Sequence, residues 1–124
     1  MVSEERHYDA VVLGSGPSGR TVAQRLAKNS FSVALVENEL VGGDCAYWAC
    51  IPSKALLRPP EALTEAKEVD GSRQAAQGPL GVESVLTRRD RFVDHWNDNN
   101  MTKALQESGV DIIRGQGKLD GPRR

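Results

Sequence analysis

The sequence predicts an α/β fold, with a three-stranded parallel sheet at its core and helices packed around it. Two short apolar runs near the N-terminus enclose a helical segment, and a third apolar run follows a long helical segment. Strands that alternate with helices in this way are typical of a parallel sheet. The length of 124 residues allows one domain of ordinary size or part of a larger one.

The first three elements form a βαβ unit. Residues 8–13 end in a continuous apolar run, which is typical of a parallel strand covered on both faces. Residues 31–36 predict a second buried strand, which ends at Glu37. The helix between them carries its apolar residues on one face, at Val22, Ala23, Leu26 and Ala27. Strand, helix and strand within about 30 residues is the usual size of such a unit.

After the second strand the pattern changes to helices and a loop. A helix is expected from Asp44, with an interruption at Pro52, and it continues over residues 53–67. The pair Pro59-Pro60 must break or restart this helix, because proline lacks the N–H that a helix interior needs. Residues 69–82 hold several glycines among polar residues, which predicts an exposed, mobile loop.

A long helical segment then leads to the third strand. Residues 83–108 are expected to be helical, and the polar run at 97–100 divides them into two parts because these side chains compete for backbone hydrogen bonds. Gly109 fits the position after the helix end, and residues 110–113 predict a third strand. The expected buried side of the helical segment consists of Val85, Phe92, Val93, Trp96, Met101, Ala104 and Leu105.

Residues 115–124 carry strand and turn signals, with Lys118-Leu119 followed by Asp120-Gly121-Pro122, and they predict the start of a β-meander. A sheet with so few strands leaves an edge open and a helix face uncovered. We therefore expect residues 1–124 to be the N-terminal portion of a longer protein or a truncated product.

Composition excludes several classes of function. The formal net charge is −1, from 16 basic and 17 acidic residues, which argues against a nucleic-acid surface. No segment approaches the roughly 18 apolar residues of a membrane span. Two cysteines cannot build a disulfide framework, so their role is expected to be chemical, in a cytoplasmic protein.

A glycine-rich turn lies between the first strand and the first helix. Gly14 permits the tight turn, Gly16 lets a phosphate approach the main chain, and Gly19 lets helix and strand pack closely. The helix N-terminus offers free N–H groups and a partial positive charge to an anion. Glu37 lies 23 residues after Gly14 (37 − 14), near the offset expected of an acid that binds an adenosine ribose. The pattern favours a dinucleotide site over a turn without a ligand, and it does not distinguish FAD from NAD.

The two cysteines, Cys45 and Cys50, are five residues apart. In a regular helix their Cα atoms would be about 8.7 Å apart, whereas a disulfide needs less than about 7 Å. The pair can therefore bond only where the helix is deformed, and Pro52 gives a cause for that. A disulfide in such a place is typical of the labile, catalytic kind.

Three other interpretations of the cysteines remain open. They could be small core residues, half of a metal site, or a pair that is rarely oxidised. A zinc site needs closer cysteines and further ligands, and His7 and His95 are poorly placed to supply them, so no metal is expected. His7 is expected on the N-terminal arm, and His95 at the surface or between helices.

The segment from Gly42 to Lys54, GGDCAYWACIPSK, resembles the redox-active segment of the flavin-dependent pyridine nucleotide–disulfide oxidoreductases. This family includes dihydrolipoamide dehydrogenase, glutathione reductase and mercuric reductase. Its members also carry the glycine motif near the N-terminus and an acid before the double glycine, as Gly14, Gly16, Gly19 and Glu37 do here. The resemblance covers essentially the whole chain and implies an incomplete Rossmann-like FAD-binding domain.

The resemblance implies a role for each matching residue. Cys45 would exchange with the disulfide or dithiol substrate, and Cys50 would face the flavin. Lys54 would lie near the reactive edge of the flavin and stabilise its reduced form, although a solvated helix lysine is the alternative. Glu37 would bind the adenosine ribose of FAD. The remaining cofactor-binding positions would be Gly14, Gly16, Pro17, Ser18, Gly19, Gly42, Gly43, Asp44 and Ser53.

The sequence also departs from the family pattern. Asp44 stands where most members have Thr, and Ala46-Tyr47-Trp48-Ala49 replaces the commoner Leu-Asn-Val-Gly between the cysteines. These changes point to a side branch and leave the substrate open. The nicotinamide-binding domain, for NAD or NADP, and the dimerisation domain of a homodimeric member are not expected within these residues. The chain alone is expected to bind FAD weakly or not at all.

Two rival functions remain open. One is a non-catalytic nucleotide-binding or interaction module with packed thiols. The other is a flavoprotein hydroxylase-type domain, which shares the glycine turn and does not need paired cysteines.

Overall fold

The structure is a computed structural model and describes residues 5–123. The described residues form two compact bodies, which are treated separately. The first body consists of residues 5–43 and 98–123, and the second of residues 44–97.

A parallel sheet of three strands forms the centre of the first body, in the order β1-β2-β3. The strands are β1 (Ala10–Leu13), β2 (Val33–Glu37) and β3 (Val110–Arg114). The register pairs Leu35 of the central strand with Val12 on one side and Ile112 on the other. The predicted three-stranded parallel sheet is thus confirmed.

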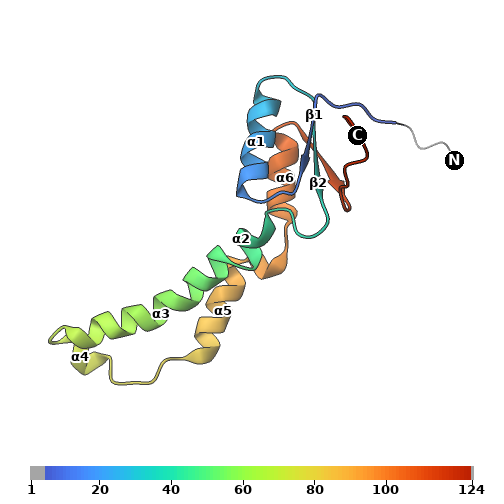
Figure 1. The fold of residues 1–124 in the computed structure, drawn as a ribbon. Helices are drawn as coiled ribbons and strands as arrows, with labels where there is room; N and C mark the ends of the chain where they lie inside the picture. Colours follow the sequence, from blue (N-terminus) through green and yellow to red (C-terminus); the bar gives the residue numbers. More distant parts are fainter. Residues whose placement is uncertain (1–4, 124) are drawn as a thin grey trace. The chain divides into compact units, whose positions relative to one another are not determined.

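Two helices pack on this sheet, α1 (Pro17–Lys28) and α6 (Asn99–Glu107), and Figure 1 shows them side by side. Pro17 occupies the first turn of α1, where its missing N–H costs nothing. The apolar stripes of both helices meet the sheet in one core, whose buried members are Ala23, Val33, Leu35, Val41, Leu105 and Val110. The 3.6-residue spacing of apolar residues in the sequence therefore predicted both helices correctly.

The edge strand β1 differs from the prediction. Val11 and Leu13 are 57% and 48% exposed, so one face of β1 is open, whereas β2 is covered along almost its whole length. The expectation that residues 8–13 are covered on both faces is wrong. An edge strand has a neighbour on one side only, and among the described residues no helix covers this second face of β1.

The segment after β3 also differs. Residues 115–123 contain turns and bends and no strand, so the start of a β-meander does not form in the described residues. A strand needs a hydrogen-bonding partner, and Leu119 stays 79% exposed. The segment instead passes over the sheet at Gly117, where a Cβ would overlap the side chain of Leu13. Arg124 lies outside the described residues.

The second body is a helical hairpin. It is built from α2 (Gly43–Tyr47), whose first residue still belongs to the first body, and from α3 (Cys50–Glu68), α4 (Ser72–Ala75) and α5 (Val82–Phe92). The helices α3 and α5 lie alongside each other, as Figure 1 shows. Helix α3 runs without a break through Pro59 and Pro60, so the predicted interruption there is wrong. Each proline removes one helical hydrogen bond, but proline's φ fits a helix and packing against α5 holds the flanking turns.

The predicted loop at 69–82 is exposed, as expected, yet it contains the short helix α4. The glutamine side chain of Gln74 caps this helix by accepting the Gly71 N–H at 2.8 Å. The long segment 83–108 is divided, as predicted, but the division begins earlier than expected, at a short 3₁₀ turn, η1 (Asp94–Trp96). All three residues of η1 have positive φ, at 49°, 51° and 57°.

The buried side of that segment was predicted in part. Val93 and Leu105 are 1% exposed, as expected, while Phe92 is 52% exposed and Ala104 also faces solvent. The left-handed residues of η1 interrupt the helix. Apolar residues before and after η1 therefore no longer lie on one helix face.

Candidate functional site

The glycine-rich turn between β1 and α1 is shaped by three glycines with different tasks. Gly14 has a φ of 91°, a left-handed conformation that favours glycine, and its N–H donates to the carbonyl of Val36 at 2.9 Å. A Cβ on Gly19 would overlap the Gly14 carbonyl, so this glycine permits the close packing of α1 on β1. The tight turn at Gly14 and the close packing at Gly19 agree with the prediction from the sequence.

The middle glycine, Gly16, faces open space. No atom lies within 4 Å of the position that its Cβ would occupy, so a ligand can approach the main chain there. Gly16 caps α1, whose first turn holds no acidic side chain, and Ser18 in that turn is exposed. The free N–H groups and the positive end of the helix dipole give this turn the properties of an anion site.

Glu37 lies at the end of β2 and is buried, with 7% of its surface exposed. One carboxylate oxygen accepts both the N–H and the hydroxyl of Ser15, at 2.9 and 2.5 Å. The other accepts the N–H of Glu39 at 2.9 Å. Burial acts to raise the pKa of Glu37, but the hydrogen bonds from Ser15, Glu39 and Asn38 outweigh it and lower the pKa. The carboxyl is therefore ionised at neutral pH.

The double glycine packs directly on the glycine-rich turn. The N–H of Gly42 donates to the hydroxyl of Ser15 at 2.9 Å, and a Cβ on Gly43 would lie 2.7 Å from the Cα of Gly16. Gly43 also has a positive φ of 72°. The structure thus brings together six residues predicted for cofactor binding: Gly14, Gly16, Gly19, Glu37, Gly42 and Gly43.

Ser15 joins these segments, and the sequence analysis missed it. Its side chain is fully buried and bridges Glu37 and Gly42. The available signal was its position between two motif glycines, where a small hydroxyl can reach backbone on both sides.

No pattern in the sequence indicated the ion pair between Asp98 and Arg114. The Arg114 guanidinium donates to both carboxylate oxygens of Asp98, at 2.6 and 3.0 Å, and to the carbonyl of Glu39 at 3.0 Å. Asp98 also accepts the N–H of Val41 at 2.6 Å. The Arg114 guanidinium lowers the pKa of Asp98, the Val41 N–H adds to the effect, and burial opposes it. This pair fixes the segment between Glu37 and the double glycine.

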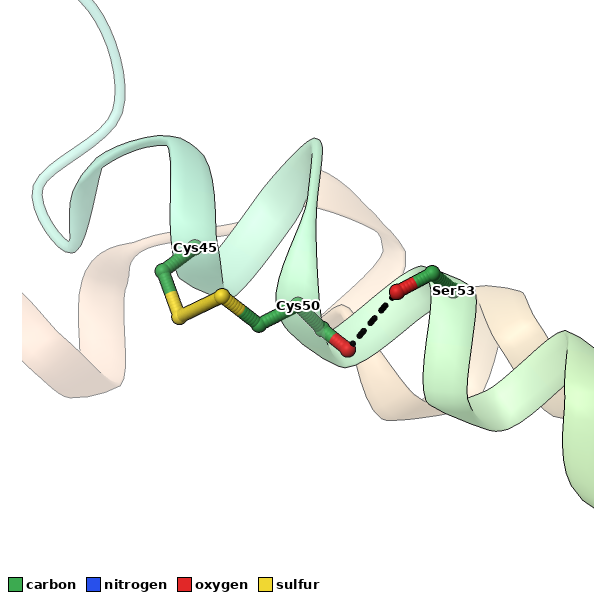
Figure 2. Close-up of a disulfide and its surroundings, with 3 residues drawn as sticks. All are labelled: Cys45, Cys50 and Ser53. Atoms are coloured by element: carbon green, nitrogen blue, oxygen red, sulfur yellow. Dashed lines mark hydrogen bonds between the residues drawn. A yellow bond between two sulfur atoms is a disulfide. The ribbon is translucent and has the colours of Figure 1, made fainter.

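In the second body, Cys45 and Cys50 form a disulfide, with their Cα atoms 4.6 Å apart (Figure 2). The distance is about half that of a regular helix, because α2 ends at Tyr47 and α3 begins at Cys50. Ala49, with φ −127° and ψ −92°, makes the break between them. The predicted deformation is confirmed. Pro52 lies in the first turn of α3, where its missing N–H favours a new helix start.

The other predicted residues of the second body lie near the starts of α2 and α3. Ser53 donates its hydroxyl to the carbonyl of Cys50 at 3.1 Å, as Figure 2 shows, and Asp44 is exposed in the first turn of α2. Lys54 is exposed and lines a cavity of about 440 Å³, together with Ile51, Arg58, Arg88 and Phe92. The Lys54 ammonium group therefore lies at this cavity, one helical turn after Cys50 on the same face of α3.

Within residues 5–123, no group of three or more His, Cys, Asp or Glu side chains could hold a metal ion. His7 and His95 are both exposed. In the same part of the chain, no helix combines the length and the apolar character that crossing a membrane requires.

Comparisons with known proteins agree with these two motifs. The sequence profile described as pyridine nucleotide-disulphide oxidoreductase matches residues 8–124. A dihydrolipoyl dehydrogenase of Bacillus subtilis is 36% identical over 93% of this chain and 24% of its own length. A mercuric reductase of Lysinibacillus sphaericus is 29% identical over 93% of this chain and 21% of its own length.

Among solved structures, the HOCl-induced flavoprotein disulfide reductase of Escherichia coli superposes with a TM-score of 0.61 at 29% identity. The match covers 90% of this chain and 22% of that protein. The chain thus spans about a quarter of the length of the curated relatives that it matches.

Proposed function

Because this chain belongs to the pyridine nucleotide-disulphide oxidoreductase family, we propose that it forms the N-terminal part of the FAD-binding domain of a flavoprotein disulfide oxidoreductase. In the complete protein, electrons pass between NADH or NADPH and a small disulfide or dithiol substrate by way of FAD and the Cys45–Cys50 pair.

One observation carries the proposal: the helix is broken at the point where a break lets the two cysteines bond. Cysteines that were only packed would need no such break, and a regular helix would keep them apart. Cys45 follows the double glycine by two residues in sequence, and that glycine pair packs on the phosphate turn.

The residues of the first body fit the ADP half of FAD. The open main chain at Gly16 and the N-terminus of α1 would hold the pyrophosphate. Glu37 is ionised, and its carboxylate would accept the ribose hydroxyls at the lone pairs that Ser15 and Glu39 leave free. Pro17, Ser18, Gly42 and Gly43 would complete this wall. FAD supplies the two-electron transfer between the nicotinamide and the disulfide.

The cysteines would act in balanced steps. Two electrons and two protons convert the Cys45–Cys50 disulfide into two thiols, and loss of a proton makes Cys45 a thiolate. This thiolate attacks one sulfur of the substrate disulfide, so that a mixed disulfide forms and one substrate thiol leaves. The Cys50 thiolate then attacks the Cys45 sulfur, which restores the intramolecular bond and releases the second thiol.

The remaining assignments rest on the same family pattern. Lys54 would stabilise negative charge at the reactive edge of the flavin, with Ser53 and Asp44 near the cofactor. The complete protein would be a homodimer in the cytoplasm, and the chain alone would bind FAD weakly, because other segments complete the cofactor's surroundings.

The test uses the complete protein with Cys45→Ser and Cys50→Ser. We expect each variant to keep its flavin, seen in the absorption spectrum, and to lose NAD(P)H-dependent reduction of disulfides. The matched control is Ser84→Ala, at an exposed position of α5 to which no role in the site is assigned. Undiminished turnover in both cysteine variants would contradict the proposal and favour the non-catalytic module.

A second test addresses the phosphate turn. Gly16→Ala adds a Cβ into open space at an ordinary backbone conformation, with φ −59°, so the fold should be kept. We expect its flavin affinity to fall at least tenfold, while Gly78→Ala, in the exposed segment between α4 and α5, leaves it unchanged. Equal flavin content in the two variants would exclude the assignment of Gly16.

A further inference from the structure

An exposed indole lies inside the loop that the disulfide closes. Trp48 is 55% exposed, although it sits between Cys45 and Cys50 in sequence. A tryptophan side chain that stays in water forgoes a large hydrophobic gain. Single exposed apolar residues are common, so the exposure gains meaning only from the contacts that hold this ring.

Those contacts fix the ring in one orientation. The rings of Trp48 and Trp96 stack, with centroids 6.0 Å apart and an angle of 30° between their planes. The Trp96 indole N–H donates to the carbonyl of Tyr47, the residue just before Trp48, at 3.2 Å. Side chain and backbone thus tie the two tryptophans together.

The guanidinium of Arg89 lies over the ring of Trp96 and stabilises the stacked pair. Its guanidinium carbon lies 5.3 Å from the centroid of the Trp96 ring, and its charge is paired with Asp90 at 2.6 Å. Because Arg89 is held by Asp90, it acts as a fixed support. The result is a pre-oriented aromatic platform, which we define as Trp48 backed by Trp96.

The helical spacing of Trp48 and Cys45 brings the bases of their side chains near each other. The Trp48 N–H donates to the carbonyl of Asp44 at 2.8 Å, so the helical turn of α2 extends as far as Trp48. Residues three apart in such a turn have Cβ atoms about 5–6 Å apart. Cys45 and Trp48 are three apart, and Cys45 is the cysteine that the proposed function assigns to substrate exchange. A group attached to the sulfur that meets Cys45 therefore comes within reach of the aromatic platform.

We propose that Trp48 is a specificity-determining residue, which stacks on the group next to the substrate sulfur and favours disulfides that carry an aromatic ring over aliphatic ones. This inference rests on the proposed function and names the substrate class for the same cysteines. A fixed indole face offers offset stacking to a second ring, and an aliphatic chain gains only the apolar contact. Pre-orientation by Trp96 means that little side-chain freedom is lost when the substrate binds.

The test compares two neutral disulfides in the complete protein, the aromatic 4,4′-dithiodipyridine and the aliphatic bis(2-hydroxyethyl) disulfide. For each variant, kcat/KM is measured with both probes, and the ratio of the two values cancels general losses. We expect Trp48→Leu to lower the ratio of kcat/KM for the aromatic probe to kcat/KM for the aliphatic probe about 3- to 10-fold. The main cause should be a higher KM for the aromatic probe. Trp48→Phe should keep most of the wild-type ratio. Val82→Ala, which shortens another exposed apolar side chain of the same body, should leave the ratio unchanged.

A second readout needs no nicotinamide. The protein is reduced with dithiothreitol, desalted and mixed with each disulfide, and the rate of disulfide reduction is followed by absorbance. The same drop in the ratio is expected for Trp48→Leu. An unchanged ratio in both assays would overturn the inference while the proposed function stands. A protein whose reduced cysteines discriminate between the probes, yet which shows no NAD(P)H-linked turnover, would support the aromatic platform and contradict the proposed function.

Discussion

Ser15 donates both its backbone N–H and its hydroxyl to the same carboxylate oxygen of Glu37, at 2.9 and 2.5 Å. The hydroxyl also accepts the N–H of Gly42. One small side chain therefore holds the glycine-rich turn, the end of β2 and the double glycine in a fixed arrangement, in the interior of the first body.

The first prediction concerns this hydroxyl. Ser15→Ala leaves the Gly42 N–H buried without an acceptor and removes one donor from Glu37, so the free energy of unfolding should fall by about 1–3 kcal/mol. Urea denaturation followed by circular dichroism measures it. Ser18→Ala, at an exposed position of the same turn, is the control and should change stability by less than about 0.5 kcal/mol. Equal effects would show that the Ser15 bridge contributes nothing.

The second prediction concerns close packing of the backbone. Gly19→Ala would force a Cβ onto the Gly14 carbonyl, so α1 must move away from β1. We expect a loss of about 1–3 kcal/mol in the free energy of unfolding. Gly78→Ala, where nothing lies within 4 Å of the added Cβ, should be nearly neutral. A stable Gly19→Ala protein would mean that the turn is looser than the structure indicates.

The third prediction compares a half-buried ion pair with an exposed one. Arg114→Ala leaves Asp98, whose side chain is only 9% exposed, without its cation, and should cost about 2 kcal/mol in unfolding free energy. Lys103→Ala breaks an exposed pair with Glu107 and should cost less than about 0.5 kcal/mol. Thermal unfolding at low salt compares the two, and similar midpoints would argue against a structural role for Arg114.

The fourth prediction concerns pH. The folded state lowers the pKa of Asp98 and of Glu37, so both groups add stability above their unfolded pKa values, near 4. This stability is lost as the pH falls through the folded pKa values, because the unfolded state then binds more protons. The unfolding midpoint should stay nearly level from pH 7 to 5 and drop below about pH 4.5.

Asp9 and Glu65 shift in the same direction, so wild type alone cannot assign the drop to one group. Asp98→Asn provides the comparison. It should be less stable than wild type at pH 7, and the gap between the two proteins should narrow as the pH is lowered. A constant gap from pH 7 to 3.5 would rule out Asp98 as a source of the acid sensitivity.

Local pattern predicted most of the first body. The apolar runs, the three glycines and the spacing to Glu37 each depend on neighbours along the chain, and β2, α1 and the glycine turn form as expected. The cysteine spacing predicted that the helix must break if the pair is bonded, and the break lies between Tyr47 and Cys50.

Contacts between distant segments decided the rest. Pro59 and Pro60 remain inside α3 because α5 packs beside it, and Leu119 finds no strand partner. The pair Asp98–Arg114 joins residues 16 apart, and the Trp48–Trp96 stack joins residues 48 apart. Such pairs have no period along the chain, so no pattern of neighbours can indicate them.

The sequence by itself determined the order of strands and helices, the glycine-rich turn and the pair of cysteines that can bond where the helix breaks, because backbone preference and side-chain chemistry are local properties. Only the tertiary structure decided how Glu37 is held by Ser15 and that Trp96 stacks on Trp48. Burial and contacts between remote side chains arise only when the chain has folded. They set the pKa of the Glu37 carboxyl and the packing of the Trp48 ring.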